Sequence, residues 1–348
     1  MNRIGIIDKL ERERDLTDAE FAALIDESTQ EEREMLFSRA RAVRERYYGR
    51  KVYIRGLIEY SNYCKNDCLY CGIRRSNRNA ERYRLTKEEI LQCCMVGYEL
   101  GFRTFVLQGG EDPYFTDERM VDIVSTIRRT YPDCAITLSL GERGRESFQK
   151  LYDAGANRYL LRHETADACH YAHLHPQELT LESRLQCLRD LKAIGYQTGT
   201  GMMVGSPYQT TECLIRDIRF IQDLQPQMVG MGPFIPHHDT PFADQPAGTA
   251  EKTLVLLAIF RLLLPRVLLP ATTALGTIDG DGREKGMNAG CNVVMPNLSP
   301  KDYRAKYLLY DNKIATGDEA AESLSSLKKR MEKAGYEIVT DRGDYKNE

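Results

Sequence analysis

Three cysteines stand at Cys-x3-Cys-x2-Cys spacing in the stretch Tyr60-Ser-Asn-Tyr-Cys64-Lys-Asn-Asp-Cys68-Leu-Tyr-Cys71-Gly72. It follows an apolar run, residues 52–60, with the composition of a β-strand. Thiolates from so short a loop can hold three corners of a cubane iron–sulfur cluster and leave the fourth iron without a protein ligand. The alternatives are a zinc loop or three unrelated buried thiols, but zinc needs a fourth ligand and none stands nearby. The loop predicts one [4Fe–4S] cluster with an open iron.

Apolar runs alternate with helical segments along the chain. We expect strands at residues 52–60, 104–107, 135–139, 157–161, 198–204, 227–231, 267–269 and 292–295. Helices are expected between them at residues 86–101, 117–130, 145–154, 181–194, 211–224 and 253–264. Strands that alternate with helices pair in parallel through right-handed crossovers. The pattern predicts an α/β fold, a complete (β/α)8 TIM-type barrel. An open sheet of six strands is the alternative if the last two runs do not pair.

The barrel accounts for residues 50–300. Residues 1–49 predict an N-terminal helical extension that covers one end of it, with helices at a capping box over 17–20 and at 30–48. Residues 301–348 predict a short C-terminal extension packing on the barrel, with a helix over 319–334. The glycine loops at 276–290 are too short to be a linker, so no second domain is expected.

Composition argues against several classes of function. The 48 basic and 51 acidic residues are interspersed and give a formal net charge of −3, so nucleic acid is not an expected partner. No apolar run approaches the roughly 20 residues that span a bilayer. The N-terminus lacks a signal-peptide pattern, so a cytoplasmic location is expected. Most of the seven cysteines outside the loop are expected to be small core residues. Of the histidines, the following are expected to lie on the surface or in loops: His170, His173, His175, His237 and His238.

A barrel carries its chemistry where its strands end. Gln108-Gly109-Gly110-Glu111 follows the second strand, and its glycines would let the backbone approach a ligand and offer carbonyls to an ammonium group. Arg162-His163-Glu164 follows the fourth strand. Alternation puts Arg162 and Glu164 on one face, where the carboxylate could grip ribose hydroxyls and the guanidinium a carboxylate. An internal Arg162–Glu164 ion pair that stiffens the loop is the alternative.

The cysteine spacing, with Tyr70 before the last cysteine, resembles the radical S-adenosylmethionine (SAM) superfamily, in which the amino and carboxylate groups of SAM chelate the open iron. Within it, residues 50–310 resemble the HydE family, the radical SAM maturases of FeFe-hydrogenase. The resemblance is carried by the cysteine loop, Leu-Gln-Gly-Gly-Glu-Asp-Pro-Tyr (107–114), Thr-Leu-Ser-Leu-Gly-Glu (137–142), Arg-Tyr-Leu-Leu-Arg-His-Glu-Thr-Ala (158–166), Gly-Pro-Phe-Ile-Pro-His-His-Asp-Thr-Pro (232–241), Pro-Ala-Thr-Thr-Ala-Leu-Gly-Thr (270–277) and Asn-Val-Val-Met-Pro-Asn (292–297).

The resemblance implies a set of roles. Cys64, Cys68 and Cys71 would be the metal-ligating and catalytic residues. SAM would lie against Tyr70, Gln108, Gly109, Gly110, Glu111, Ser139, Glu164, Arg184, Met203 and Tyr307. A small anionic substrate would be bound by Thr137, Arg158, Arg162, Thr272 and Thr273. The implied activity is reductive cleavage of SAM to a 5′-deoxyadenosyl radical. The implied substrate is a cysteine-ligated iron carbonyl–cyanide complex, and the implied partners are the maturases HydG and HydF and an electron donor.

One departure from the family and three alternatives follow. Some HydE proteins carry a second cysteine trio near the C-terminus for an accessory cluster. No cysteine follows Cys291, so a single cluster is expected. Biotin synthase needs a further cluster inside its barrel, and the spare cysteines fall on expected helices or at strand beginnings. Cysteine counting does not exclude methylornithine synthase. Outside catalysis, the alternative is an iron–sulfur carrier, which would produce no 5′-deoxyadenosine.

Overall fold

The computed structural model describes residues 3–314 and 320–346 and contains a parallel sheet of six strands. Their order is β2 (Gly56–Ser61), β3 (Thr104–Gly109), β4 (Ala135–Ser139), β5 (Arg158–Leu160), β6 (Gln197–Thr200) and β8 (Met228–Val229). The register sets Gln108 of β3 between Glu59 of β2 and Ser139 of β4. Side chains at the carboxyl ends of these strands therefore meet at one edge of the sheet.

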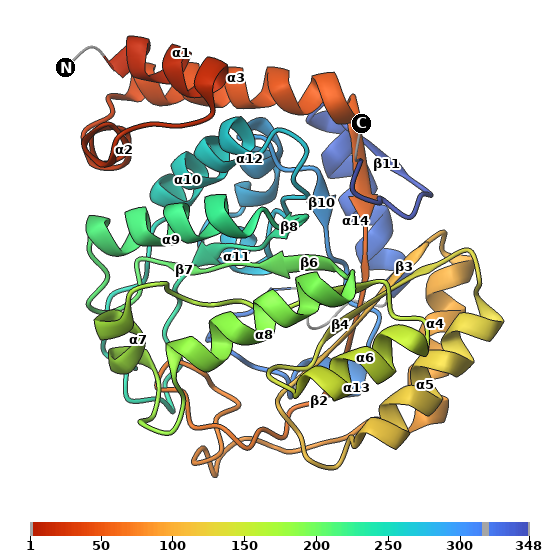
Figure 1. Ribbon diagram of the computed structural model, residues 1–348. Helices are drawn as coiled ribbons and strands as arrows, with labels where there is room; N and C mark the ends of the chain where they lie inside the picture. Colours follow the sequence, from red (N-terminus) through yellow and green to blue (C-terminus); the bar gives the residue numbers. More distant parts are fainter. Residues whose placement is uncertain (1–2, 315–319, 347–348) are drawn as a thin grey trace.

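Helices cover the outside of this sheet (Figure 1). They are α4 (Lys87–Glu99), α5 (Asp117–Thr130), α6 (Arg145–Asp153), α8 (Leu181–Ile194), α9 (Thr211–Leu224) and α10 (Ala250–Leu263). Five of the six begin after a threonine whose side chain accepts a hydrogen bond from a first-turn N–H: Thr86, Thr116, Thr180, Thr210 and Thr249. Such caps are encoded locally, which explains why the expected bounds of α5, α8 and α9 are confirmed.

The remaining strand pairs differ from the expected pattern. The first expected strand is divided at Arg55 into β1 (Lys51–Ile54) and β2. β1 pairs in parallel with β10 (Val293–Val294) and with β11 (Glu337–Val339), a C-terminal strand that the sequence did not predict. β7 (Met203–Val204) and β9 (Gly232–Pro233) form a separate pair.

The expected strand at 267–269 contributes isolated bridges. Parallel bridges join Met228 to Leu268, Pro270 to Val293 and Leu57 to Asn297. Four short helices were also not expected: α7 (Ala168–Leu174), α11 (Thr273–Ile278), α12 (Gly282–Asn288) and α13 (Lys301–Arg304). α14 (Ala320–Lys333) matches the expected terminal helix, whose first residue, Glu319, lies outside the described residues.

Three N-terminal helices lie together on the side of the molecule opposite the cysteine loop (Figure 1). They are α1 (Arg3–Glu13), α2 (Asp18–Asp26) and α3 (Gln30–Tyr48), and capping boxes open α2 and α3. The fully buried guanidinium of Arg44 donates to the carbonyls of Cys291, Gly49 and Lys51 at 3.2, 2.6 and 2.7 Å. These bonds join α3 to the start of β1 and to the turn before β10.

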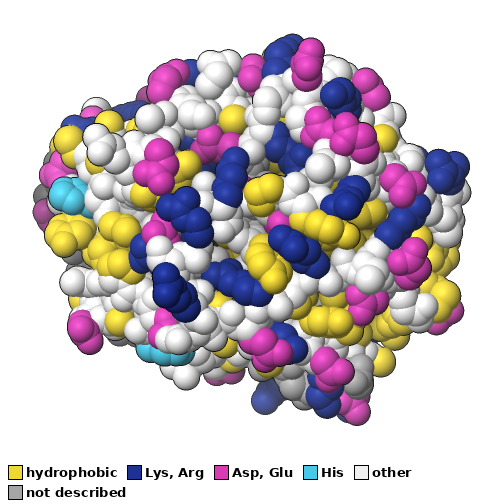
Figure 2. All heavy atoms as spheres, turned by 90° about the horizontal axis from the view of Figure 1, so that it is seen from below, with side chains coloured by type: hydrophobic (Ala, Val, Ile, Leu, Met, Phe, Trp, Pro, Cys, Tyr) yellow, Lys and Arg dark blue, Asp and Glu magenta, His cyan; other side chains and the backbone are white. Residues whose placement is uncertain are grey.

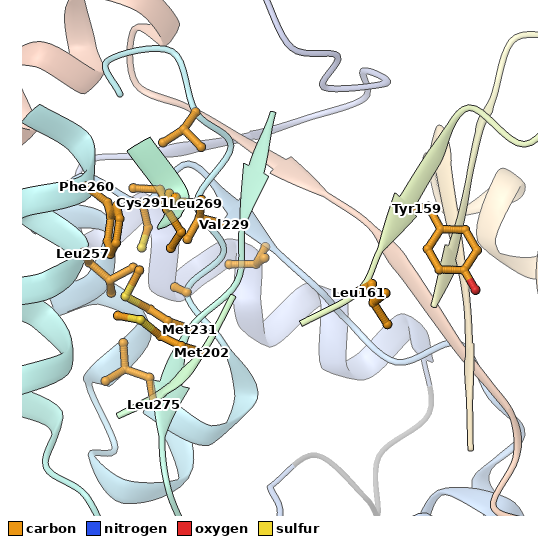
Figure 3. Packing of buried hydrophobic residues seen from close by; sticks show 14 of the residues in the cluster. Tyr159, Leu161, Met202, Val229, Met231, Leu257, Phe260, Leu269, Leu275 and Cys291 are labelled. Carbon is orange, nitrogen blue, oxygen red and sulfur yellow. The ribbon is translucent and has the colours of Figure 1, made fainter. Parts of the chain in front are cut away.

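Strand side chains that face the helices form the hydrophobic core. Figure 3 shows Leu257 and Phe260 of α10 directed toward Met202, Met231 and Leu269. Six cysteines outside the loop are buried, as expected of core residues: Cys93, Cys94, Cys134, Cys187, Cys213 and Cys291. No helix in the described part of the chain is long and apolar enough to cross a bilayer.

Candidate active site

The cysteine loop leaves the carboxyl end of β2 and is held by main-chain hydrogen bonds to three separate parts of the fold. The N–H of Lys65 donates to the carbonyl of Glu111 at 2.9 Å. The N–H of Leu69 donates to Leu174 of α7 at 2.9 Å, and the N–H of Gly72 to Leu309 at 2.9 Å. Cys64, Cys68 and Cys71 are half-buried in this loop. Their positions are thus set by the edge of the sheet, by α7 and by the C-terminal segment together.

Arg82 closes the loop from its far side. Its guanidinium donates to the carbonyls of Ile73, Arg74 and Asn77 at 2.8, 2.6 and 3.0 Å, and also to the carbonyl of Asn62. All four acceptors are main-chain oxygens, so the interactions hold the loop's path while leaving the positive charge of Arg82 near the thiols.

The thiols fit a polynuclear cluster better than a single ion. Burial raises the pKa of Cys71 to about 12 and raises that of Cys68 still further, so both need a bound cation to become thiolates. In the described part of the chain, the one group of three possible metal ligands within 4.8 Å of one another is His237, His238 and Asp239. The three cysteine sulfurs do not form such a group. The three sulfurs are therefore more widely spaced than one ion requires, as a [4Fe–4S] cluster demands.

Gly109 and Gly110 allow the cysteine loop to pack against the end of β3. A Cβ on Gly110 would lie 2.2 Å from the carbonyl oxygen of Tyr63 and 2.9 Å from Cβ of Cys64. A Cβ on Gly109 would lie 2.6 Å from the Tyr60 ring. The glycines are thus required by close approach of the loop itself.

A charged network lies next to the loop. Glu111 lies 3.3 Å from Nζ of Lys65 and 4.0 Å from Arg184, which is 2.8 Å from Glu142. Burial opposes the charge of Arg184, but Tyr171, Glu142 and Glu111 outweigh it and raise its pKa. Arg184 is consequently a fixed cation near Cys68 rather than a solvated helix residue.

A cavity of about 240 Å³ opens beside the loop. Its walls bring together eight of the residues singled out in the sequence: Tyr70, Cys71, Gln108, Arg162, Glu164, Met203, Thr272 and Thr273. They come from the cysteine loop, from the ends of β3 and β5, and from β7 and α11. The loop and the strand ends therefore share one cavity.

Arg162 and Glu164 form the ion pair that was the alternative interpretation, at 2.9 Å. The two paired atoms, Nη2 of Arg162 and Oε2 of Glu164, and also Nε of Arg162 are buried, and none of them forms a hydrogen bond of good geometry with the described residues. Glu164 has a φ of +65°, which a residue with a side chain seldom adopts. A buried ion pair with incomplete hydrogen bonding at a strained position is typical of a ligand-binding feature.

The buried side chain of His163 supports the turn that contains Glu164. Its Nδ1 lies 2.8 Å from Oγ1 of Thr200, and its Nε2 lies 3.2 Å from Oδ1 of Asp217. The same Asp217 oxygen accepts the N–H of Ala166 at 2.5 Å. His163, Thr200 and Asp217 are all fully buried, so the turn that carries Glu164 is fixed on its inner side.

The other predicted site residues lie outside the cavity walls. Gly109, Gly110, Glu111 and Arg184 adjoin the cysteine loop, as described above. Tyr307 is buried and interacts with the side chain of Gln108. Ser139 ends β4 beside Gln108. Thr137 is buried lower on β4, and its hydroxyl has no partner.

Arg158 is not brought to this cavity. It begins β5, and its guanidinium pairs with Asp344 of the C-terminal segment at 2.6 Å and with Oγ1 of Thr104 at 3.2 Å. Alternation puts Arg158 and Arg162 on one face, but four residues of strand separate them by about 13 Å. The expectation that both residues line one substrate cavity is wrong for Arg158, which instead joins the amino end of the sheet to the C-terminal segment.

Sequence reasoning missed a buried charge pair in the cavity wall. Nζ of Lys313 lies 2.6 Å from Oε1 of Glu59, whose other oxygen accepts Nδ2 of Asn297 at 2.8 Å. The side chains of Glu59 and Lys313 are 1% and 7% exposed. A glutamate inside the apolar run 52–60 was a usable signal for Glu59, whereas no local pattern marks Lys313.

The histidine expectation is also wrong in part, because His170, His175 and His237 are buried. Burial lowers the pKa of His175 to about 3. His237, His238 and Asp239 are the close-set group of possible ligands noted above, but Nδ1 of His237 already accepts the N–H of Asp239 at 3.1 Å.

A three-cysteine loop at the end of the first strand of a parallel α/β sheet, beside a cavity with charged side chains in its wall, defines the class of protein. The family profile described as the radical SAM superfamily matches residues 58–221. The chain belongs to the radical SAM superfamily and is a radical SAM enzyme.

More specific similarity is to the maturases of FeFe-hydrogenase. The chain is 44% identical to the [FeFe] hydrogenase maturase subunit HydE of Thermotoga maritima, over 98% of this chain and 97% of that protein. It is 32% identical to 3-methylornithine synthase of Methanosarcina acetivorans, over 92% and 90% of the two chains. The crystal structure of methylornithine synthase (PylB) matches with a TM-score of 0.86 at 30% identity, covering 96% of this chain and 97% of that one.

Proposed function

We propose that this chain reductively cleaves SAM and directs the resulting radical at a small anionic substrate in the cavity, as a HydE-type maturase of FeFe-hydrogenase. The observation that carries the proposal is the shared cavity, which joins Cys71 and Tyr70 to the incompletely hydrogen-bonded ion pair of Arg162 and Glu164. The 44% identity to HydE supports the choice of pathway.

Cys64, Cys68 and Cys71 are the proposed ligands of one [4Fe–4S] cluster. When bound, such a cluster would offer its open iron to SAM and supply the electron for its cleavage to 5′-deoxyadenosyl radical and methionine. SAM is proposed to be oriented by the residues around the space beside the loop, which are Gln108, Gly109, Gly110, Glu111, Ser139, Arg184 and Tyr307. Arg82 keeps the cysteine loop closed during this step.

Glu164 is proposed to accept hydrogen bonds from the ribose hydroxyls, since its buried Oε2 pairs with Nη2 of Arg162 but accepts no hydrogen bond of good geometry from the described residues. Met203 would pack against the adenosine. Arg162, Thr272 and Thr273 are proposed to bind the anionic substrate deeper in the cavity, with Thr137 below them. A cysteine-ligated iron carbonyl–cyanide complex is the proposed substrate, HydG its source and HydF the recipient of the product. With SAM and substrate bound, the largely apolar walls would exclude water that would quench a radical.

A cavity of this kind is best enclosed by a complete barrel. The bridges from Met228 to Leu268, Pro270 to Val293 and Asn297 to Leu57 continue the strand order from β8 back to β2 and support closure into eight strands. Residues 50–300 are proposed as the barrel, with 1–49 and 301–348 as its extensions and a cytoplasmic location.

The first test is anoxic reconstitution with iron and sulfide, followed by dithionite and SAM. Production of 5′-deoxyadenosine is expected and should vanish in Cys68→Ala, while circular dichroism stays unchanged. An iron–sulfur carrier would give none with either protein. Glu164→Gln should weaken SAM binding, measured by the change that SAM causes in the EPR spectrum of the reduced protein.

A second test separates the relatives. HydE activity requires that the chain restore hydrogenase maturation in an extract that contains HydG and HydF but lacks HydE. The similarity to methylornithine synthase in sequence and structure makes that enzyme the competing candidate. Formation of 3-methylornithine without any support of maturation would overturn the hydrogenase assignment and keep the radical SAM chemistry.

A further inference from the structure

The surface around the cysteine loop carries an excess of positive charge. Residues 63–84 contain six basic and two acidic side chains, although the whole chain has a formal net charge of −3. Both acidic side chains are paired locally, Asp67 with Arg74 at 2.8 Å and Glu81 with Lys306. Figure 2 looks onto this side of the molecule, where Lys and Arg side chains gather around a hollow.

Several of these cations have no carboxylate partner. Arg78 is exposed, and Arg82 donates only to main-chain carbonyls. Across the loop, Arg119 is exposed and lies 3.7 Å over the ring of Tyr114. Within residues 3–314 and 320–346, none of these three forms an ion pair with a carboxylate. Their charge is available to an external anion or an acidic protein.

Two exposed tyrosines stand among the arginines. Tyr63 and Tyr114 are 36% and 45% exposed, and the guanidinium of Arg84 lies over both rings at 3.8 and 4.8 Å. Arg84 is itself held by Asp112 at 2.7 Å. Stacked tyrosine and arginine side chains lose little freedom when covered, and residues of these types dominate protein interfaces.

This surface adjoins the proposed cluster directly. Tyr63 and Lys65 flank Cys64 in the sequence, and Arg75 bonds through its N–H to the carbonyl of Asn66 within the loop at 2.8 Å. Electron transfer between proteins weakens steeply with the distance between their centres. A partner covering these side chains would bring its own redox centre as near to the three cysteines as the fold permits.

We propose that the surface formed by Tyr63, Lys65, Arg75, Arg78, Arg84, Tyr114 and Arg119 is the docking site of a small acidic one-electron carrier protein. This inference rests on the proposed function, which requires one electron for each SAM cleaved. The carrier's reduced centre loses that electron and the cluster held by the three cysteines gains it, with no bond made or broken. Charge complementarity selects an acidic carrier and speeds its encounter, and brief redox complexes have small interfaces.

The test uses the reconstituted full chain and an acidic low-potential bacterial ferredoxin as the probe. Arg75→Glu/Arg78→Glu reverses two exposed charges on the docking surface. Arg12→Glu/Arg41→Glu makes the same change on α1 and α3, at the opposite side of the molecule. The dissociation constant is measured by calorimetry at 50 and 300 mM salt, and ferredoxin oxidation by stopped flow.

The surface pair should weaken ferredoxin binding at least tenfold at low salt, and the control pair less than twofold. High salt should weaken the unmodified complex and remove most of the difference. Equal effects of both pairs, or no salt dependence, would overturn the docking site. Dithionite-driven deoxyadenosine production should be unchanged in the surface pair. Its absence from the unmodified chain would instead refute the proposed function, so the two failures are distinguishable.

Discussion

The Glu59–Lys313 pair makes the sharpest prediction about stability. Lys313→Met removes the ammonium that lies 2.6 Å from a carboxylate of 1% exposure and leaves that carboxylate with one side-chain donor, Asn297. Removing one partner of a buried pair costs about 3–5 kcal/mol. Because both groups border a cavity that admits water, we expect about 3 kcal/mol. Glu59→Gln removes the negative charge that balances the ammonium, which keeps the carbonyl of Tyr307 at 2.9 Å and the face of its ring at 5.0 Å, and should cost a similar amount.

The double variant Glu59→Gln/Lys313→Met decides whether the charges are coupled. The double variant leaves no charged group at these two positions, so it should lower the free energy of unfolding by about 1–2 kcal/mol, less than either single change. Urea unfolding followed by circular dichroism at one pH measures all four proteins. A double variant destabilised by the sum of the two single changes would refute the reasoning.

A matched surface pair supplies the control. Lys87 and Asp122 are 2.7 Å apart, close to the 2.6 Å of the buried pair, but their side chains are 31% and 57% exposed. The corresponding cycle, Lys87→Met and Asp122→Asn, should give a coupling of about 0.5 kcal/mol, since water and salt screen exposed pairs. Equal coupling in both cycles would show that burial is not the cause.

Three further changes test other parts of the structure. Thr86→Ala removes the cap of α4 and should lower the free energy of unfolding by about 1 kcal/mol without changing iron content; an unchanged unfolding midpoint would contradict the capping role. Gly110→Ala puts a Cβ 2.2 Å from the carbonyl oxygen of Tyr63 and should sharply reduce the iron bound on reconstitution while circular dichroism is retained; full iron content would contradict the close packing. A hydrogen bond to Asp311 raises the pKa of His238, so its stabilisation is complete below about pH 6.5 and is lost as pH rises through the raised value. His238→Gln should therefore lower the urea midpoint at pH 5.5 but not at pH 9, and equal effects at both would refute the linkage.

The sequence by itself determined the features that depend on local signals. The spacing of Cys64, Cys68 and Cys71 indicates an open-site cluster because three ligands within eight residues need no help from distant parts of the chain. Threonine caps and helical periodicity predicted the bounds of α3, α5, α8 and α9, since both act within one or two turns. Residues after the strands predicted eight side chains of the cavity wall, because parallel strands end at one edge.

Only the tertiary structure decided where separate segments meet. Arg158 was expected in the cavity, but it pairs with Asp344 at the amino end of the sheet. Alternation along a strand predicts on which face a side chain lies, but not how far along the strand it lies from the cavity. Lys313 reaches Glu59 across 254 positions of sequence, and β11 joins β1 from the far end of the chain. Such pairings arise when whole helices and strands pack together, because a buried charge is stable only beside an opposite charge. The two partners are too far apart in the sequence for a local pattern to predict them.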